Sequence, residues 1–145
     1  MTPAIPDEVN RIFASAPFIA DLGIRLESAG PGTCTTVLPL ERRHLQQDGY
    51  VHAGVQATIA DHTAGAAAAS LVKDGQSVLS AEFKINLLRA AKGERLICRA
   101  KVLKAGAQLT VVESEVFCAA SGEERLVSKA TVTLAVIPRR VEPPG

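Results

Sequence analysis

The second half of the sequence alternates between apolar and polar residues in stretches of about ten residues. The alternation is clearest at positions 111–117 and 131–136. A period of two is typical of a strand that faces a core on one side and solvent on the other. We therefore predict four strands, at residues 78–88, 94–103, 108–119 and 125–137.

The strands are separated by short turn-like pairs, which are Lys92-Gly93, Ala105-Gly106 and Ser121-Gly122. Strands joined by such short turns must pair antiparallel, because a parallel crossover needs a dozen or more residues. A further strand-like stretch at residues 24–38 is interrupted at Gly30-Pro31-Gly32, where we expect a turn or a bulge.

One long helix is predicted at residues 54–72, because Val55, Ile59, Ala66 and Ala69 recur at three- and four-residue spacing. Most other residues of this segment are small, so neighbouring backbone can approach the helix on several sides. A short helix is expected at residues 8–15, followed by a connection at residues 17–23 and a polar loop at residues 39–50.

One long helix and an antiparallel sheet of about five to six strands give an α+β domain. The 145 residues suffice for a single domain, which we place at residues 1–137 with an N-terminal helical extension at residues 1–18. Residues 138–145 are expected to form a C-terminal tail.

Composition excludes several function classes. Lysines and arginines number 16 against 15 acids, and aromatic residues are few, so nucleic acid is not an expected partner. The apolar stretch at residues 54–72 contains Asp61 and His62, which argues against a membrane span. The first residues lack the basic start and apolar run of a signal peptide, so we expect a cytoplasmic protein.

Metal and cofactor chemistry finds no support in the residues. The cysteines Cys34, Cys98 and Cys118 are far apart, and we interpret them as inert thiols. The three histidines have no zinc-type grouping, and no cofactor motif is present, so no metal and no cofactor are expected.

The densest polar region, residues 42–54, runs directly into the long helix. The start of a helix presents free backbone amides that can hold an oxyanion. Asp61 follows two turns into the helix among alanines and glycines, where a carboxylate is costly unless it is paired or used. A functional acid and an exposed or ion-paired acid both fit this position.

Residues 44–61 read HLQQDGYVHAGVQATIAD. This segment resembles the signature of the PaaI-like acyl-CoA thioesterases, His-Leu-Asn-x-x-Gly-x-x-His-Gly-Gly-x-x-x-x-Leu-x-Asp. The resemblance continues through residues 80–93, SAEFKINLLRAAKG, and along the later strands. It implies a hotdog fold, in which a curved antiparallel sheet wraps the helix. It also implies homodimers that share one continuous sheet and assemble into a homotetramer, with active sites across the dimer interface.

The same resemblance implies roles for individual residues. Asp61 would be the nucleophile or the general base, and the sequence leaves both routes open. The Ala53 amide would be the oxyanion donor, and Gln46 would orient the thioester carbonyl or the water. His52 would support the loop, and Ser80 would help to position the water. The family usually has Gly where Ala53 stands, and many members have Asn where Gln46 stands.

We assign substrate binding to a second group of residues, which is Gly54, Gln47, Lys84, Asn86 and Arg89. Arg89 and Lys84 belong to a basic edge with Lys92, which either is ordinary solvated surface or holds coenzyme A phosphates. His62 is interpreted as structural or subunit-contacting, because it points about 100° away from Asp61 on a helix. His44 is interpreted as a solvated or hydrogen-bonded loop residue.

The sequence thus predicts an acyl-CoA thioesterase that binds an acyl-CoA substrate. Two alternatives stay open: a non-catalytic acyl-CoA-binding hotdog module, and a hotdog 3-hydroxyacyl dehydratase, whose His-Phe-Pro loop is absent at His44. The acyl group is left open. Aromatic candidates for its pocket are Phe18, Phe83 and Phe117, too few to make a flat aryl pocket obvious.

Overall fold

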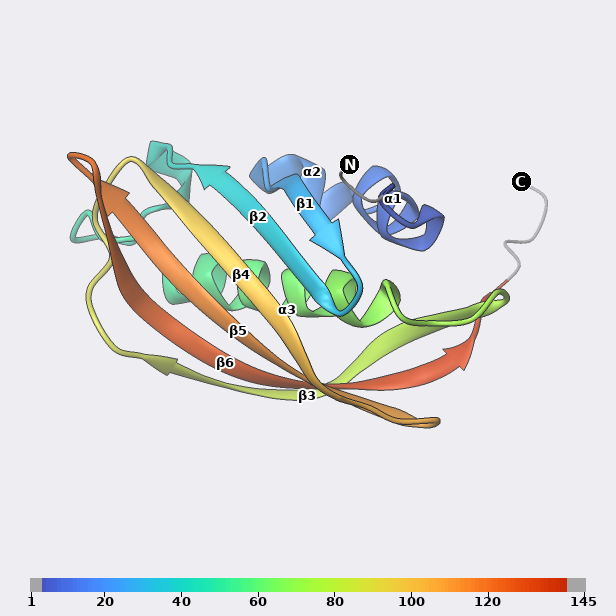
Figure 1. The fold of residues 1–145 in the computed structure, drawn as a ribbon. Helices are drawn as coiled ribbons and strands as arrows, with labels where there is room; N and C mark the ends of the chain where they lie inside the picture. The colour runs from blue at the N-terminus through green and yellow to red at the C-terminus, as the bar shows by residue number, and fades with distance from the viewer. Residues whose placement is uncertain (1–3, 141–145) are drawn as a thin grey trace.

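The computed structural model describes residues 4–140. Its elements follow in chain order as α1 (Asp7–Ala14), α2 (Pro17–Leu22), β1 (Arg25–Gly30), β2 (Thr33–Pro39), the 3-10 helix η1 (Arg42–His44), α3 (Ala53–Ala69), β3 (Gln76–Leu87), β4 (Arg95–Ala105), β5 (Leu109–Ala120) and β6 (Glu123–Pro138). Figure 1 labels the α-helices and the strands.

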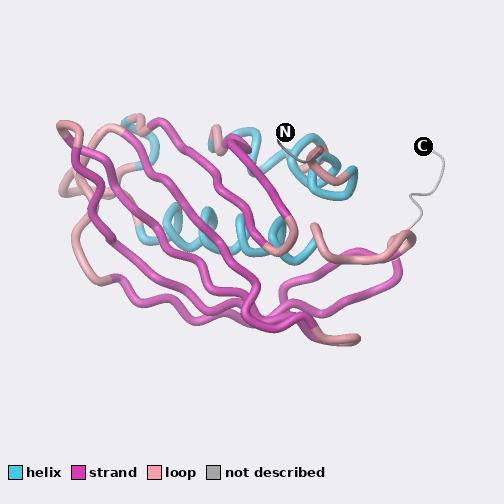
Figure 2. Tube along the Cα trace, viewed as in Figure 1, coloured by secondary structure: helices cyan, strands magenta, loops and turns pink. Residues whose placement is uncertain are grey.

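The strands form one six-stranded antiparallel sheet in the order β1-β2-β4-β5-β6-β3. Figures 1 and 2 show the sheet curving around α3, which lies against its concave face. One long helix wrapped by a curved antiparallel sheet is the hotdog fold, so that prediction is confirmed. Strands β1 and β3 are the two edges of the sheet.

Small side chains let the sheet approach α3 closely. Ala60, Ala64, Ala66 and Ala67 are fully buried, and so is Ile59 on the same helix. Polar groups of the helix also find partners in this interface.

Two side-chain hydrogen bonds connect α3 to the sheet. The hydroxyls of Thr36 and Thr63 lie 2.7 Å apart, and Ser114 Oγ donates to the Ala60 carbonyl over 2.8 Å. The interior is therefore both close-packed and hydrogen-bonded, which fixes the helix relative to the strands.

The predicted connection at residues 17–23 is wrong, because Pro17–Leu22 form α2. The two residues that suggested a break are the ones that begin and end a helix. Pro17 occupies the first turn, where its missing N–H is not needed. Gly23 ends the helix with φ of 92°, and its amide donates to the Ile19 carbonyl over 3.1 Å.

The N-terminal helices pack onto the domain. Val9 of α1 is fully buried, and the Phe13 ring lies edge-on to His62 of α3, with 4.6 Å between ring centroids. Glu8 accepts hydrogen bonds from Arg11 and from Ser77 of β3, and the Arg11 guanidinium is the main cause of its lowered pKa.

Strand β6 runs to Pro138, and residues 141–145 of the predicted tail lie outside the described residues. Within residues 4–140, no helix combines the length and apolarity needed to cross a membrane.

Candidate active site

Asp61 of α3 and Ser80 of the edge strand β3 are hydrogen-bonded to each other. Asp61 is half-buried on α3, and Ser80 Oγ donates a 2.6 Å hydrogen bond to its Oδ1 atom. The two residues are 19 positions apart, so the fold rather than the local sequence joins them. Asp61 also lines a cavity of about 380 Å³ between α2, α3 and β3.

A β-bulge in β3 determines which side chains face α3. Ser80 pairs with Leu134 of β6, whereas Glu82 pairs with Thr133, so Ala81 is an extra residue. Side chains alternate along a strand, and the extra residue reverses the alternation. Phe83 therefore pairs with Val132 and shares the inner face with Ser80.

Gln46 closes the loop that precedes α3. Its side-chain Oε1 atom accepts hydrogen bonds from the backbone amides of Asp48 (2.6 Å) and Tyr50 (3.1 Å). The backbone amide of Gln46 donates to the Tyr50 carbonyl over 2.7 Å. Gly49 turns the chain with φ of 86°. Because the side-chain oxygen is committed to the loop, the Nε2 donor is the part of Gln46 that can act on a ligand.

His52 is the N-cap of α3. Its Nδ1 atom accepts a 2.8 Å hydrogen bond from the Gly54 amide. A Cβ atom at Gly54 would lie 3.0 Å from that Nδ1, so glycine gives the imidazole room to cap the helix. The backbone amide of the preceding residue, Ala53, is free to bind a ligand. Ala53 is exposed, and no group within residues 4–140 accepts its N–H.

His44 is buried and hydrogen-bonded, so of its two expected environments, solvated or hydrogen-bonded, the structure shows the second. Its Nδ1 atom accepts from the Glu41 amide over 3.0 Å, and its Nε2 atom lies 2.7 Å from the Leu22 carbonyl. An acceptor at Nδ1 and a carbonyl at Nε2 indicate a neutral ring with its proton on Nε2. His44 thus hydrogen-bonds the loop to the end of α2.

His62 and the cysteines are placed as structural groups. Burial lowers the pKa of His62, and its Nε2 atom is buried without a hydrogen-bond partner in the described chain. Burial raises the pKa of Cys34 and of Cys98 to about 12 and also raises that of Cys118. Thiols that stay protonated are poor nucleophiles, so the interpretation of these residues as inert is supported.

The two halves of the predicted site lie apart within one chain. Gln46, Ala53 and the buried Gln56 line a cavity of about 340 Å³ with the Leu87–Ala91 segment, whereas Asp61 lines the other cavity. Ala53 and Asp61 are eight positions apart on α3, or about 12 Å along the helix. A single carbonyl group cannot contact both from the same chain.

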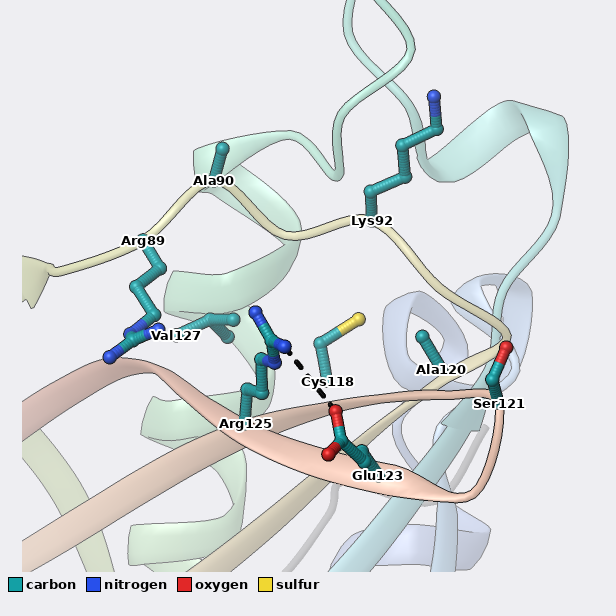
Figure 3. Close-up of a pocket in the computed structure, with 9 residues that line it drawn as sticks. All are labelled: Arg89, Ala90, Lys92, Cys118, Ala120, Ser121, Glu123, Arg125 and Val127. Carbon is teal, nitrogen blue, oxygen red and sulfur yellow. Dashed lines mark hydrogen bonds and ion pairs between the residues drawn. The ribbon is translucent and has the colours of Figure 1, made fainter.

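A third cavity of about 460 Å³ lies beside the loop cavity, where the β3–β4 connection meets the β5–β6 turn. Figure 3 shows Arg89 and Arg125 reaching into the same space, whereas Lys92 points away from it. Glu123 pairs with Arg125 over 3.3 Å and leaves Arg89 as an excess positive charge. Arg89 and Ala90 line this cavity and the Gln46 cavity, so the two adjoin.

Lys84 and Asn86 are not brought to Asp61. They pair with Thr131 and Lys129, and the inner-face residues Phe83 and Ile85 alternate with them. Their side chains therefore lie on the outer face of the sheet. Gln47 is exposed, and its Nε2 donates to Asp48 over 3.2 Å. Substrate binding by these three residues stays a prediction.

Sequence reasoning missed two residues that line these cavities, namely Gln56 and Arg125. Phe18 was named as an aromatic candidate for the acyl pocket, and it lines the Asp61 cavity. Gln56 gave a signal, since it follows Ala53 by three residues and so shares its helix face. Its Nε2 atom lies 3.5 Å from the Val51 carbonyl, where it supports the loop. No sequence pattern pointed to Arg125, because only the β5–β6 turn brings it close to Arg89.

The comparisons agree with this geometry. A sequence model of the thioesterase superfamily matches residues 48–124, more than half of the chain. The chain belongs to the thioesterase superfamily. The matched residues run from the Gln46 loop through α3 to the first residues of β6, and α1 and α2 lie before them.

Individual relatives support membership in this superfamily. The structure of a thioesterase family protein from Silicibacter pomeroyi is 38% identical, covers 94% of this chain and 100% of that chain, and superposes with a TM-score of 0.91. A conserved protein from Pseudomonas aeruginosa is 30% identical over 84% of this chain and 94% of its own, with a TM-score of 0.77. The 1,4-dihydroxy-2-naphthoyl-CoA hydrolase of Escherichia coli is 29% identical over 80% of this chain and 83% of its own.

Proposed function

We propose that this thioesterase hydrolyses acyl-CoA thioesters to a free acid and coenzyme A, with Asp61 as the central catalytic group. The observation that carries the proposal is the Ser80–Asp61 hydrogen bond of 2.6 Å at the edge of a cavity. A carboxylate oriented by a hydroxyl can attack a thioester carbon or take a proton from water. Either route ends with the thiolate of coenzyme A leaving and the acyl group carrying the water oxygen.

The Ala53 amide is the proposed oxyanion donor. It is exposed at the start of α3, has no acceptor within residues 4–140, and carries the favourable dipole of a helix N-terminus. Gln46 Nε2 lines the same cavity and is proposed to orient the carbonyl or the water. His52 is proposed to act through the loop, since its Nδ1 is used as the helix cap.

Two protomers are proposed to complete each site. Ala53 and Asp61 of one chain are about 12 Å apart along α3, so the donor and the carboxylate that act on one thioester would come from different chains. Strand β3 supports this arrangement: it is an edge strand of 12 residues, and Leu79 and Leu87 on it are exposed. A second β3 can pair with such an edge and extend the sheet. We propose a homodimer of this kind that assembles into a homotetramer.

The coenzyme A phosphates are proposed to bind at Arg89 and Arg125. Both side chains reach into the basic cavity of Figure 3, which adjoins the cavity lined by Gln46 and Ala53. Guanidinium groups bind phosphate in a two-pronged geometry. An acyl-CoA whose carbonyl lies at Ala53 can therefore extend toward Arg89 along one face of the molecule. Gly54 contributes by leaving room for the His52 cap.

The test is thiol release from a panel of short-chain, medium-chain and aryl acyl-CoAs, followed with a thiol-reactive dye. The three free cysteines are buried and burial raises their pKa values, which slows their reaction with the dye, and a blank without substrate measures what remains. We expect turnover on at least one substrate and a loss of about 100-fold or more in Asp61→Asn, which keeps the shape but removes the charge. Asp74→Asn, an exposed carboxylate beyond α3, is the control.

Two results would contradict the proposal. Asp61→Asn with the turnover of the wild type would remove Asp61 from the mechanism. A folded, oligomeric wild type that releases no thiol from any substrate, while it binds them, would favour the non-catalytic acyl-CoA-binding module.

A further inference from the structure

The cavity beside Asp61 has an aromatic wall, part of which comes from outside the region matched by the superfamily. Phe18 and Ile19 of α2 and Phe83 of β3 line it, together with Ala57 and Thr58 of α3 and the polar pair Asp61 and His62. The superfamily match begins at residue 48, so α2, like β1 and β2, lies outside the matched residues.

The surfaces that face this cavity are apolar apart from Asp61 and the ring of His62. Phe18 is 63% exposed and Phe83 is 44% exposed, although each borders the same hollow. The Thr58 hydroxyl donates to the Gly54 carbonyl over 2.7 Å, so its one donor is used within the helix. Uncovered phenyl groups beside a carboxylate favour an apolar group that enters next to the reacting carbon.

Helix α2 is held in place by the loop that leads to Gln46. A six-residue helix has little stability of its own, so its position depends on such contacts. The Arg43 guanidinium donates to the carbonyls of Asp21 and Leu22, and the His44 ring bonds to Leu22 over 2.7 Å. The His44 carbonyl in turn accepts from the His52 amide over 2.9 Å. The aromatic wall and the start of α3 are thus fixed by one set of hydrogen bonds.

We infer that α2 is the acyl-selecting wall of the site and that Phe18, opposite Phe83, selects an aryl acyl group. This inference rests on the proposed function, because the acyl group is bound next to Asp61. Two phenyl side chains favour a flat ring over a flexible chain, since ring–ring contacts add to the burial of apolar area. A rigid ring also loses less rotational freedom on binding than an alkyl chain of similar size.

The test compares kcat/KM for benzoyl-CoA and hexanoyl-CoA in the wild type, Phe18→Ala, Phe18→Leu and the control Leu103→Ala. Leu103 is 56% exposed on β4 and does not line this cavity. We expect the benzoyl-to-hexanoyl ratio to fall by about tenfold in Phe18→Ala. Phe18→Leu should lower it by an intermediate factor because it keeps apolar bulk without the ring, and Leu103→Ala should leave it unchanged. A ratio that stays constant in both Phe18 variants, or a wild type that prefers hexanoyl-CoA, would overturn the inference.

A binding measurement separates this inference from the proposed function. S-benzyl-coenzyme A is a thioether that cannot be hydrolysed, and its dissociation constant can be compared with that of coenzyme A by calorimetry. Tighter binding of the benzyl compound that weakens about tenfold in Phe18→Ala would support the wall even if no thioester is turned over. Equal binding of both compounds would overturn it. The inference would also be overturned if Phe18→Ala changed the oligomeric mass but changed neither the benzoyl-to-hexanoyl ratio of kcat/KM nor the ratio of the two dissociation constants. Phe18 would then contact a second copy of the chain instead of the acyl group.

Discussion

Ser80 of β3 donates a 2.6 Å hydrogen bond to Asp61 of α3, and the bulge at Ala81 places Phe83 on the same inner face of the strand as Ser80. Without the extra residue, one of the two side chains would lie on the outer face of the sheet. The bulge therefore combines a polar contact to the carboxylate with an aromatic contact to the proposed acyl group.

Removing the hydroxyl tests this relationship. We expect Ser80→Ala to lower kcat by about 10- to 100-fold, because a hydrogen bond to a charged group is lost at the reacting carboxylate. KM should change little, since Ser80 does not line the basic cavity where the phosphates are proposed to bind. Ser80→Thr, which keeps the hydroxyl, is the matched control. A Ser80→Ala enzyme with unchanged kcat would separate Ser80 from the chemistry.

His52 is expected to act through the start of α3 rather than by proton transfer. His52→Ala removes the acceptor for the Gly54 amide and should cost about 1 kcal/mol in the free energy of unfolding, with a parallel loss of kcat. His52→Ser supplies another N-cap oxygen and should recover most of both quantities. Denaturant unfolding and steady-state kinetics measure them side by side. A stable but inactive His52→Ser would indicate that the imidazole itself moves a proton.

His62 should make stability depend on pH. Burial lowers its pKa below the ordinary value of 6.5, so the unfolded chain binds the proton first as the pH falls. Stability is thus highest above about pH 6.5 and decreases below it. We expect the Tm of the wild type to drop by about 2–4 °C more than that of His62→Leu between pH 7.5 and pH 5.5. Glu8 does not contribute there, because its lowered pKa matters only below 4.5. Equal Tm changes in both proteins would contradict this role.

The sequence predicted the strands and the long helix well because their patterns are local. Antiparallel pairing followed from the short turns, and the hotdog arrangement was implied by the resemblance of residues 44–61 to the PaaI-like thioesterase signature. The observed boundaries of these strands and of the long helix differ from the predicted ones by one to three residues. Helix α2 was missed because a proline and a glycine six residues apart were interpreted as breaks instead of as the two ends of a short helix.

The site was predictable only in part. The Ser80–Asp61 pair came from the family resemblance, and the structure brings the two residues together. The outward position of Lys84 and Asn86 depends on the bulge at Ala81, and no residue pattern in β3 predicts that bulge. Phe18 and Phe83 are 65 positions apart, and only the packing of α2 against α3 and β3 places them on one cavity. Side chains that meet through tertiary packing leave no periodic signal in the sequence.

The central claim, a thioesterase site made by the Ala53 amide of one protomer and Asp61 of the other, has a direct genetic test. Ala53→Pro removes the amide hydrogen and should preserve the helix, because proline is favoured in its first position. His52 already has the extended conformation that a following proline requires, with ψ of 138°. Ala53→Pro and Asp61→Asn should each be folded and inactive.

The decisive measurement is thiol release by an equal mixture of Ala53→Pro and Asp61→Asn protomers that have been unfolded and refolded together. In a mixed dimer, one site receives both mutations and the other receives none. Half of the dimers should be mixed, so the account predicts about one quarter of the wild-type activity. Activity no greater than that of the separate variants, in a mixture whose mixed dimers are verified by mass spectrometry of the intact assembly, would contradict the account.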